Sequence, residues 1–217
     1  MLTSGDRTVG DCLGVLDDVA GLGLRHVGFK DVGVSPDLLE TLHRRIKEIG
    51  ATSYLEVVSL TAQSTRQSAR VARRLGVDCL LGGGDPEAVF GEISTTGIEY
   101  FPFAGRPMGH PTELEGSPEE IAADCRRADA LGCAGVDLLA FRSIAASPLD
   151  LVRAARQALG GKLIVAGSVD SPARVRELDA LGVDAFTIGT ALFERRFLPG
   201  EPSLRAQVAA ALAASVT

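Results

Sequence analysis

Two short apolar runs near the C-terminus each end in a glycine followed by a hydroxyl residue. Residues 163–168 read Leu-Ile-Val-Ala-Gly-Ser and residues 185–190 read Ala-Phe-Thr-Ile-Gly-Thr, with one helix-length stretch between them. A strand that stops at such a pair before a helix leaves bare backbone N–H groups and a hydroxyl where a phosphate can bind. The alternative is a pair of tight turns that use glycine only for its backbone geometry.

Two charged residues, Lys30 and Glu56, stand in apolar stretches that we predict to be neighbouring strands. A buried carboxylate is costly unless it is paired, so we expect Glu56 to pair with Lys30. A lysine partly withdrawn from water has a lowered pKa and acts as a general acid or base, or forms a Schiff base. We predict catalysis with Glu56 as base and Lys30 as acid, with a purely structural ion pair as the alternative. Asp31 is either a partner of Lys30 or a cap of the following loop.

Charged residues also stand in two loops that follow predicted strands. The loop after the fifth strand begins Gly-Arg-Pro-Met-Gly-His at residues 105–110 and is longer than its neighbours, as expected of a lid. We expect His110 to do acid–base work and Arg106 to hold a second anionic group, although an exposed histidine without a function is common in such loops. Asp6 and Arg7, just after the first strand, complete the predicted rim of the site.

The sixth strand offers Asp137 and Arg142, five residues apart. Alternation along a strand puts them on opposite faces unless a bulge intervenes. We expect Arg142, nearer the C-terminal end of the strand, to bind an anion. Asp137 should lie deeper, as a buried partner of Lys30 and Glu56.

Repeated capping signals mark where the helices start and end. Five serine or aspartate residues precede a proline and offer an N-cap oxygen: Ser35, Asp85, Ser117, Ser147 and Ser171. Ser117 with Glu120, and Ser147 with Asp150, also match a capping box. Four helical patterns close on a C′ glycine and lead into an apolar run: Gly23, Gly76, Gly132 and Gly182.

Eight apolar runs alternate with eight helical segments, and several runs are continuously apolar, as in parallel strands buried on both faces. We therefore predict an α/β protein with a single-domain (β/α)8 TIM barrel over residues 1–217. An open doubly wound sheet is less favoured because no G-x-G-x-x-G follows the first strand. The functional site of a barrel lies at the C-terminal strand ends. The predicted strands are residues 2–3, 25–30, 53–59, 79–83, 98–103, 136–141, 163–167 and 185–189.

Composition limits the class of protein. The 217 residues are 46% hydrophobic, which is ample for a sizeable core, and the net charge of -6 without a Lys/Arg cluster argues against a nucleic-acid partner. Four cysteines without a C-x-x-C pair fit reduced thiols. No apolar stretch approaches the ~20 residues that span a bilayer. We expect a soluble cytoplasmic protein with no membrane partner.

Residues 164–172 and 181–193, which contain the two Gly-hydroxyl pairs, resemble the ribulose-phosphate-binding barrel superfamily. The likeness is to enzymes such as the phosphoribosyl isomerase and cyclase of histidine biosynthesis and the N-acetylmannosamine-6-phosphate epimerase. The resemblance implies that Gly167, Ser168, Gly189 and Thr190 hold a substrate phosphate, together with the N-terminus of the short helix that follows. It covers about thirty residues, and elsewhere it extends only to the pattern of the fold.

These features predict an enzyme that acts on a small phosphorylated metabolite in carbohydrate metabolism. An isomerase or epimerase that moves a proton next to a carbonyl is the leading hypothesis, with Lys30, Glu56 and His110 as acid and base. The alternatives are an aldolase or related lyase with Lys30 as Schiff-base former, an oxidoreductase, and a non-catalytic phosphometabolite sensor. We predict no cofactor and no metal site, because no histidine spacing suggests a metal triad. Assembly into a homo-oligomer is left open.

Overall fold

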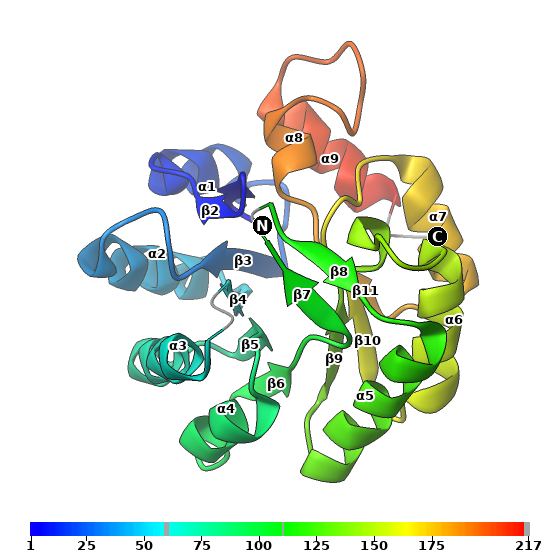
Figure 1. The fold of residues 1–217 in the computed structure, drawn as a ribbon. Coiled ribbons are helices and arrows are strands. Elements are labelled where there is room, and N and C mark those ends of the chain that lie inside the picture. The colour runs from blue at the N-terminus through cyan, green and yellow to red at the C-terminus, as the bar shows by residue number, and fades with distance from the viewer. Residues whose placement is uncertain (59–60, 110, 215–217) are drawn as a thin grey trace.

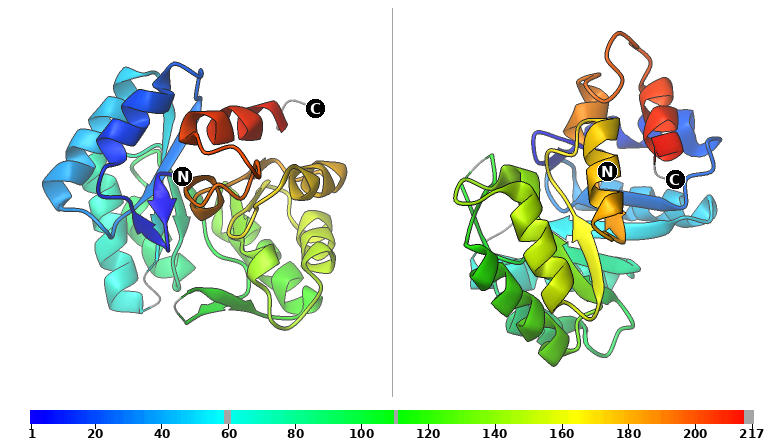
Figure 2. Two further views of the ribbon diagram at one scale, coloured as in Figure 1. Left: turned by 90° about the horizontal axis from the view of Figure 1, so that it is seen from above. Right: turned by 90° about the vertical axis from the view of Figure 1, so that its right-hand side faces the viewer.

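A ring of parallel strands with helices around it forms the structure (Figures 1 and 2). It is a computed structural model that describes residues 1–58, 61–109 and 111–214. The predicted catalytic residue His110 therefore lies outside the described residues. None of the described helices is long and apolar enough to cross a membrane.

Seven parallel strands within the described residues follow one another around the ring in chain order. The first four form one sheet, in which Lys30 lies opposite Glu56, and the last three form another. The two sheets join where the N–H of Asp137 donates to the carbonyl of Pro102 at 2.8 Å. The strands are β3 (His26–Lys30), β4 (Thr52–Val57), β5 (Cys79–Gly82), β6 (Glu99–Phe101), β9 (Gly135–Leu138), β10 (Lys162–Val165) and β11 (Ala185–Phe186).

The N-terminal segment closes the ring between β11 and β3. The N–H of Leu2 donates to the carbonyl of Gly28 at 2.7 Å, and the backbone nitrogen of Met1 donates to the carbonyl of Ile188 at 2.8 Å. Residues 1–2 thus take the place of the predicted first strand. Strand β11 is shorter than predicted, ending at Phe186, so this seam has the least strand pairing of the ring.

Helices follow the strands and cover the outside of the ring, and their ends agree with the capping signals. Four of the five predicted N-cap side chains accept a backbone N–H, and the capping box of Ser117 and Glu120 is complete. The capping box predicted at Ser147 is wrong: its side chain makes no cap bond, and Asp150 pairs with Arg153. The helices are α1 (Cys12–Ala20), α2 (Pro36–Glu48), α3 (Ala62–Leu75), α4 (Pro86–Ile93), α5 (Pro118–Leu131), α6 (Pro148–Ala158), α7 (Pro172–Ala180), α8 (Thr190–Phe193) and α9 (Leu204–Ala214).

The predicted C′ glycines also have the backbone that this position requires. All four lie at positive φ, where residues with a Cβ are strained: Gly23, Gly76, Gly132 and Gly182. Gly76, Gly132 and Gly182 stand directly at the ends of their helices. The predicted position is wrong for Gly23, because α1 already ends at Ala20 with Gly21 as its C-cap.

Two antiparallel hairpins were not predicted. One joins β1 (Thr3–Ser4) to β2 (Arg7–Thr8), and the other joins β7 (Arg106–Met108) to β8 (Glu113–Glu115). The second hairpin occupies the loop that we expected to be a lid, and in Figure 1 it lies in front of β9 to β11. The chain beyond β11 forms the short α8, a projecting loop and then α9.

The side chains inside the ring change from apolar to ionisable along the barrel axis. A small apolar cluster fills part of the interior: Cys79, Leu81, Phe101 and Ile164. Toward the C-terminal ends of the strands the interior positions are instead ionisable residues, all buried: Lys30, Glu56 and Asp137. The large apolar core lies between the strands and the helices. The fold therefore carries its buried charge at the strand ends, where a barrel has its functional site.

Gly135, at the start of β9, packs directly against the backbone of β10. A Cβ at this position would collide with the carbonyl oxygen of Lys162, which cannot rotate away as a side chain can. We expect Gly135→Ala to lower the free energy of unfolding by about 1–3 kcal/mol, measured in urea titrations.

Gly91→Ala is the matched control. Gly91 lies inside α4, and a Cβ there has no atom within 4 Å. Because alanine is the better helix former, this substitution should raise the free energy of unfolding by about 0.5–1 kcal/mol. If Gly135→Ala and Gly91→Ala changed the free energy of unfolding equally, the close packing of β9 against β10 would be contradicted.

Candidate active site

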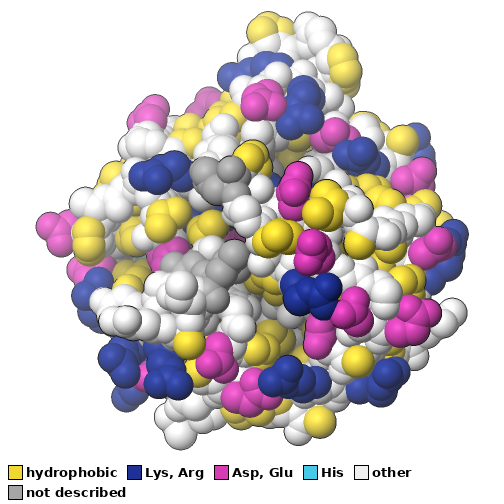
Figure 3. Space-filling view, in the orientation of Figure 1, with side chains coloured by type: hydrophobic (Ala, Val, Ile, Leu, Met, Phe, Trp, Pro, Cys, Tyr) yellow, Lys and Arg dark blue, Asp and Glu magenta, His cyan; other side chains and the backbone are white. Residues whose placement is uncertain are grey.

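A cavity of about 560 Å³ lies at the C-terminal ends of the strands. Both predicted Gly-hydroxyl turns line it, and so do Lys30 and Glu56. The β1–β2 turn, residues 111–113 and Arg142 complete much of its wall. On the face shown in Figure 3, Lys and Arg side chains are interspersed with Asp and Glu, without a large patch of one sign.

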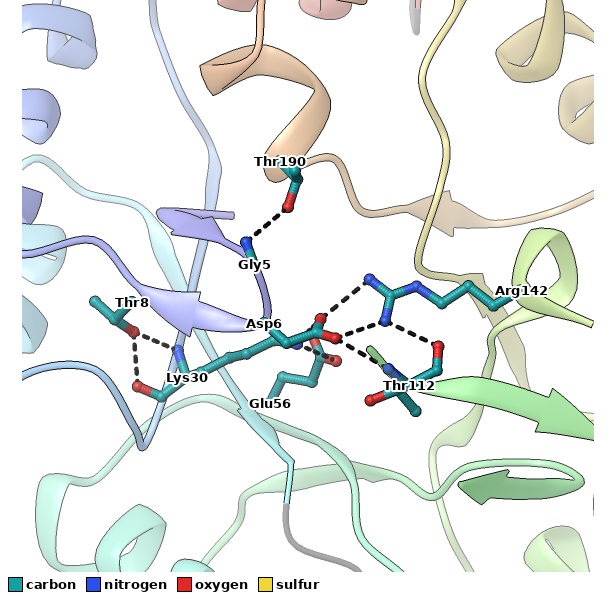
Figure 4. Close-up of polar contacts among 8 residues, drawn as sticks. All are labelled: Gly5, Asp6, Thr8, Lys30, Glu56, Thr112, Arg142 and Thr190. Carbon is teal, nitrogen blue, oxygen red and sulfur yellow. Dashed lines mark hydrogen bonds and ion pairs between the residues drawn. The ribbon is translucent and has the colours of Figure 1, made fainter. Parts of the chain in front are cut away.

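Asp6 connects three separate segments of the chain (Figure 4). It follows Gly5 in the β1–β2 turn, where both residues have a left-handed backbone, with φ of 55° and 58°. Its carboxylate accepts from Lys30 Nζ at 2.9 Å, from Arg142 Nη1 and Nη2 at 2.9 and 3.0 Å, and from the N–H of Thr112 at 3.3 Å. The side chain is only 5% exposed. Asp6 is thus the common acceptor of the site.

The cations around Asp6 determine its ionisation. Burial by itself would raise the pKa of the carboxyl group. The hydrogen bond from Arg142 and the charge of Lys30 outweigh burial and hold the pKa well below its usual value. Asp6 is therefore a carboxylate at neutral pH.

Lys30 is fixed at both its backbone and its ammonium group. The hydroxyl of Thr8 donates to the Lys30 carbonyl at 2.7 Å and accepts from the Lys30 N–H at 2.8 Å. Nζ lies 2.9 Å from Asp6 Oδ1 and 3.1 Å from Glu56 Oε1. The predicted Lys30–Glu56 ion pair is therefore present, since the register of β3 and β4 sets the two residues side by side.

The sequence prediction of a lowered pKa for Lys30 is wrong. Desolvation does favour the neutral amine, as expected for a buried lysine. The charges of Glu56 and Asp6, with the hydrogen bonds they accept, act in the opposite sense and raise the pKa above its ordinary value. Lys30 is an ammonium ion in this site.

Asp137 is completely buried in the interior of the ring, behind the wall of the cavity. It is not among the cavity-lining residues, and neither of its carboxylate oxygens has a hydrogen-bond partner among the described residues. Desolvation, and then the charge of Glu56, raise the pKa of Asp137 well above its usual value. Burial and the neighbouring carboxylate therefore both favour the protonated form of Asp137 beside the charged pair.

Arg142 reaches the site from a single 3₁₀ turn, η1 (Ala140–Arg142), that follows β9. Because the strand ends at Leu138, the alternation expected between Asp137 and Arg142 does not apply. The guanidinium binds Asp6 through two nitrogens, and Nη1 also donates to the Thr112 carbonyl at 3.3 Å. These bonds tie the β8 side of the second hairpin to the charged cluster, so this segment is a fixed part of the wall.

The first Gly-hydroxyl turn has the backbone that only a few residues tolerate. Gly167 has a φ of 71° and Ser168 a φ of 56°. A Cβ at Gly167 would lie 2.5 Å from Arg142 Nε, so glycine also lets the arginine pack against the turn. Arg174 donates to the Ser168 carbonyl and lies over the Phe141 ring, 4.6 Å from its centroid.

The second turn lies at the seam of the ring. A Cβ at Gly189 would lie 2.5 Å from Thr3 Oγ1, so the close approach of the N-terminal segment requires glycine here. Thr190 Oγ1 accepts from the N–H of Gly5 at 3.1 Å. The β1–β2 turn therefore contacts this Gly-hydroxyl pair through Gly5 and the charged cluster through the next residue, Asp6 (Figure 4).

Besides Asp137, three more of the predicted site residues that the structure describes do not line the cavity. Arg106, in β7, has a side chain that is 61% exposed and pairs with Glu120. Arg7 is exposed on β2, and Asp31 accepts a hydrogen bond from Ser68 of α3. The hairpin geometry explains Arg106, because the strand that carries it turns its side chain toward α5.

The sequence analysis named Asp6 as a rim residue but missed the turn that holds it and several other residues that organise the site. Gly5 and Asp6 form a two-residue turn, and a Gly-Asp pair between short extended runs is a recognisable hairpin signal. Thr8 and Thr112 carried no local signal, because their roles depend on contacts with distant strands. Among the described residues, no group of three or more His, Cys, Asp or Glu side chains is arranged to hold a metal ion.

Solved structures with low sequence identity share this fold. Orotidine 5′-phosphate decarboxylase from Pyrococcus horikoshii OT3 aligns with a TM-score of 0.66 at 17% identity, over 94% of this chain and 91% of that chain. The Amycolatopsis orientalis BexX/CysO complex gives 0.66 at 22% identity, over 95% and 86%. Phosphoribosyl anthranilate isomerase, bound to reduced 1-(o-carboxyphenylamino)-1-deoxyribulose 5-phosphate, gives 0.63 at 13% identity, over 94% and 93%.

These likenesses show the fold. The chain is a (β/α)8 barrel, so the fold that the resemblance to the ribulose-phosphate-binding barrels implied is confirmed. No family model matches the chain, and no curated protein sequence matches it.

The buried Asp137 predicts a specific dependence of stability on pH. In the unfolded chain an aspartate ionises with a pKa of about 3.9, whereas in the fold its pKa is raised. The stability that the protonated group provides is present below that pH and is lost as the pH rises toward the folded pKa. The side chain in Asp137→Asn does not titrate. Its free energy of unfolding, relative to that of the wild type, should therefore rise by up to about 1.4 kcal/mol per pH unit in this window.

Urea unfolding of both proteins between pH 4 and pH 8 measures this difference. A stability difference that stays constant across the range would show that Asp137 is ionised in the fold.

Proposed function

We propose that the chain is an enzyme that acts on a small phosphorylated metabolite of phosphosugar size. One observation carries the proposal: the two Gly-hydroxyl turns and the Lys30–Glu56 ion pair line the same cavity. In this proposal the phosphate lies against the backbone at residues 167–168 and 189–190. The carbon skeleton then extends toward Lys30 and Glu56.

The reaction that these groups support best is an isomerisation or epimerisation. Glu56 would remove a proton from the carbon next to a carbonyl group and return it to the neighbouring position or to the other face. The Lys30 ammonium would donate a hydrogen bond to the carbonyl oxygen and stabilise the negative charge that develops there. Asp137 does not line the cavity, so we give it an electrostatic role behind Glu56.

The charge state of Lys30 favours this reaction over a Schiff-base lyase. A Schiff base forms only from the neutral amine. With Asp6 and Glu56 both within 3.1 Å of Nζ, the ammonium form is stabilised and the neutral amine is not. A buried Lys–Glu pair in the cavity also supports an enzyme rather than a sensor that only binds phosphate, because binding at the two turns does not require it.

The compared barrels support the ligand class. One is a decarboxylase named for a 5′-phosphate, and another is an isomerase bound to a deoxyribulose 5-phosphate derivative. Both align over more than nine-tenths of this chain.

Phosphate binding should depend on the Gly-hydroxyl turns. At Gly167 an alanine is strained by the φ of 71°, and its Cβ would collide with Arg142. We expect Gly167→Ala to weaken the binding of inorganic phosphate by about tenfold or more in titration calorimetry. Gly10→Ala is the control, because a Cβ there meets no atom within 4 Å. If Gly167→Ala bound phosphate with wild-type affinity, the phosphate site would not lie at this turn.

The proton-transfer step should depend on Glu56 and Lys30. A panel of phosphorylated aldoses and ketoses incubated in D₂O should show exchange of the proton next to the carbonyl group, followed by NMR. We expect Glu56→Gln and Lys30→Met each to lower kcat by about 10²–10⁴-fold, with a smaller change in KM.

The chain offers a matched pair of controls at the other end of the barrel. Lys162 and Glu99 form an exposed ion pair at 2.9 Å. Lys162→Met and Glu99→Gln remove the same charges without touching the cavity wall and should leave kcat unchanged. If all four variants lost activity equally, the loss would reflect folding rather than catalysis.

A further inference from the structure

We propose that Asp6 is a positioning residue of this site: it holds the Lys30 ammonium between two carboxylates and thereby prevents Lys30 from acting as an amine nucleophile. The inference rests on the proposed function, because it explains why Lys30 would act in proton transfer and not in Schiff-base formation. It assigns to the β1–β2 turn the role of holding the Lys30 ammonium, which neither Gly-hydroxyl turn has.

The carboxylate of Asp6 is saturated with donors. Oδ1 accepts from Lys30 and Arg142, and Oδ2 accepts from Arg142 and the N–H of Thr112. A carboxylate has about four lone-pair positions, and four donors occupy them here. Asp6 therefore has no capacity left to act as a base toward a substrate, and its part in the site is to hold the groups around it.

The ammonium of Lys30 has three N–H donors, and two of them are committed. One faces Asp6 at 2.9 Å and one faces Glu56 at 3.1 Å, in a side chain that is only 5% exposed. Loss of the proton would leave two buried carboxylates without the cation between them, which is strongly unfavourable. The third N–H can donate to a substrate oxygen. Lys30 in this state can therefore act as an acid, but it has no free electron pair with which to act as a nucleophile.

The position of Asp6 also relates this cation to the phosphate turns. Its neighbour Gly5 donates to Thr190 at 3.1 Å, and Arg142, which Asp6 holds by two bonds, packs against Gly167. One two-residue turn thus contacts both ends of the cavity. A ligand held at the two turns meets Lys30 at a distance that this turn determines.

Imine formation with an aldehyde probe tests the proposal. Nζ of a neutral lysine attacks the aldehyde carbon, a C–N bond forms and water leaves; borohydride then adds hydride to the imine carbon and gives a stable secondary amine. Pyridoxal 5′-phosphate and pyridoxal are the two probes, and peptide mass spectrometry locates the adduct. The chain has only three lysines, and the other two, Lys47 and Lys162, are 44% and 56% exposed and serve as internal standards.

We expect wild-type protein at neutral pH to form adducts at Lys47 and Lys162 and very little at Lys30. Asp6→Asn retains the size of the side chain without its charge, and it should raise the Lys30 adduct by about tenfold or more relative to the two standards. Asp6→Glu, which restores the charge, should return the adduct toward the wild-type level. Asp37→Asn, which removes an exposed aspartate from α2, is the charge-matched control and should behave as wild type.

Two results would overturn the proposal. One is a wild-type Lys30 that reacts as readily as the two exposed lysines, and the other is an Asp6→Asn variant whose Lys30 reacts no faster. Should Asp6→Asn fail to fold, a wild-type Lys30 that reacts as readily as Lys47 and Lys162 would still overturn the proposal. Pyridoxal has no phosphate, so a Lys30 that follows these expectations with pyridoxal, in a protein that binds no inorganic phosphate, would contradict the proposed function and leave the role of Asp6 intact.

Discussion

The buried carboxylate of Asp6 is the interaction on which the arrangement of this site depends. It accepts four hydrogen bonds from three segments that are far apart in the chain, and two of its partners are full positive charges. A charge buried among cations is stable only while all of them are in place, because removing one partner leaves another uncompensated. Strand β3, the turn after β9 and the β7–β8 hairpin are therefore held relative to one another by electrostatics as well as by packing.

The balance of charge explains why the pKa values of Asp6 and Asp137 shift in opposite directions. Lys30 and Arg142 supply two positive charges, and Asp6 and Glu56 match them through contacts of 2.9–3.1 Å. Asp137, buried in the same interior, has no hydrogen-bond donor among the described residues, and burial beside Glu56 raises its pKa. One small region therefore holds Asp6, whose pKa is lowered by cations, and Asp137, whose pKa is raised behind the cavity wall. Groups whose pKa values are driven apart by their surroundings are what acid–base chemistry requires.

The seam of the barrel has a chemical consequence as well as a structural one. Strand β11 is short, and the N-terminal segment completes the ring through single hydrogen bonds to each side. Close approach at the seam brings Thr3 against Gly189 and Gly5 against Thr190. The irregular backbone at residues 187–189 leaves the second Gly-hydroxyl pair at the cavity instead of inside a regular strand. The weakest pairing in the ring thus coincides with the proposed phosphate site.

The sequence by itself determined the order of the barrel strands and helices, most helix ends and one pairwise contact. Capping residues such as Ser117 and glycines such as Gly76 act within a few residues, so the helix ends could be predicted, and consecutive parallel strands set Lys30 beside Glu56. The tertiary structure alone decided the role of Asp6, whose partners Thr112 and Arg142 lie 106 and 136 residues away. It also reversed the predicted pKa shift of Lys30, because that shift depends on how many carboxylates surround the ammonium. Local sequence encodes backbone conformation, whereas the charge around a buried group is a sum over segments that meet only when the barrel closes.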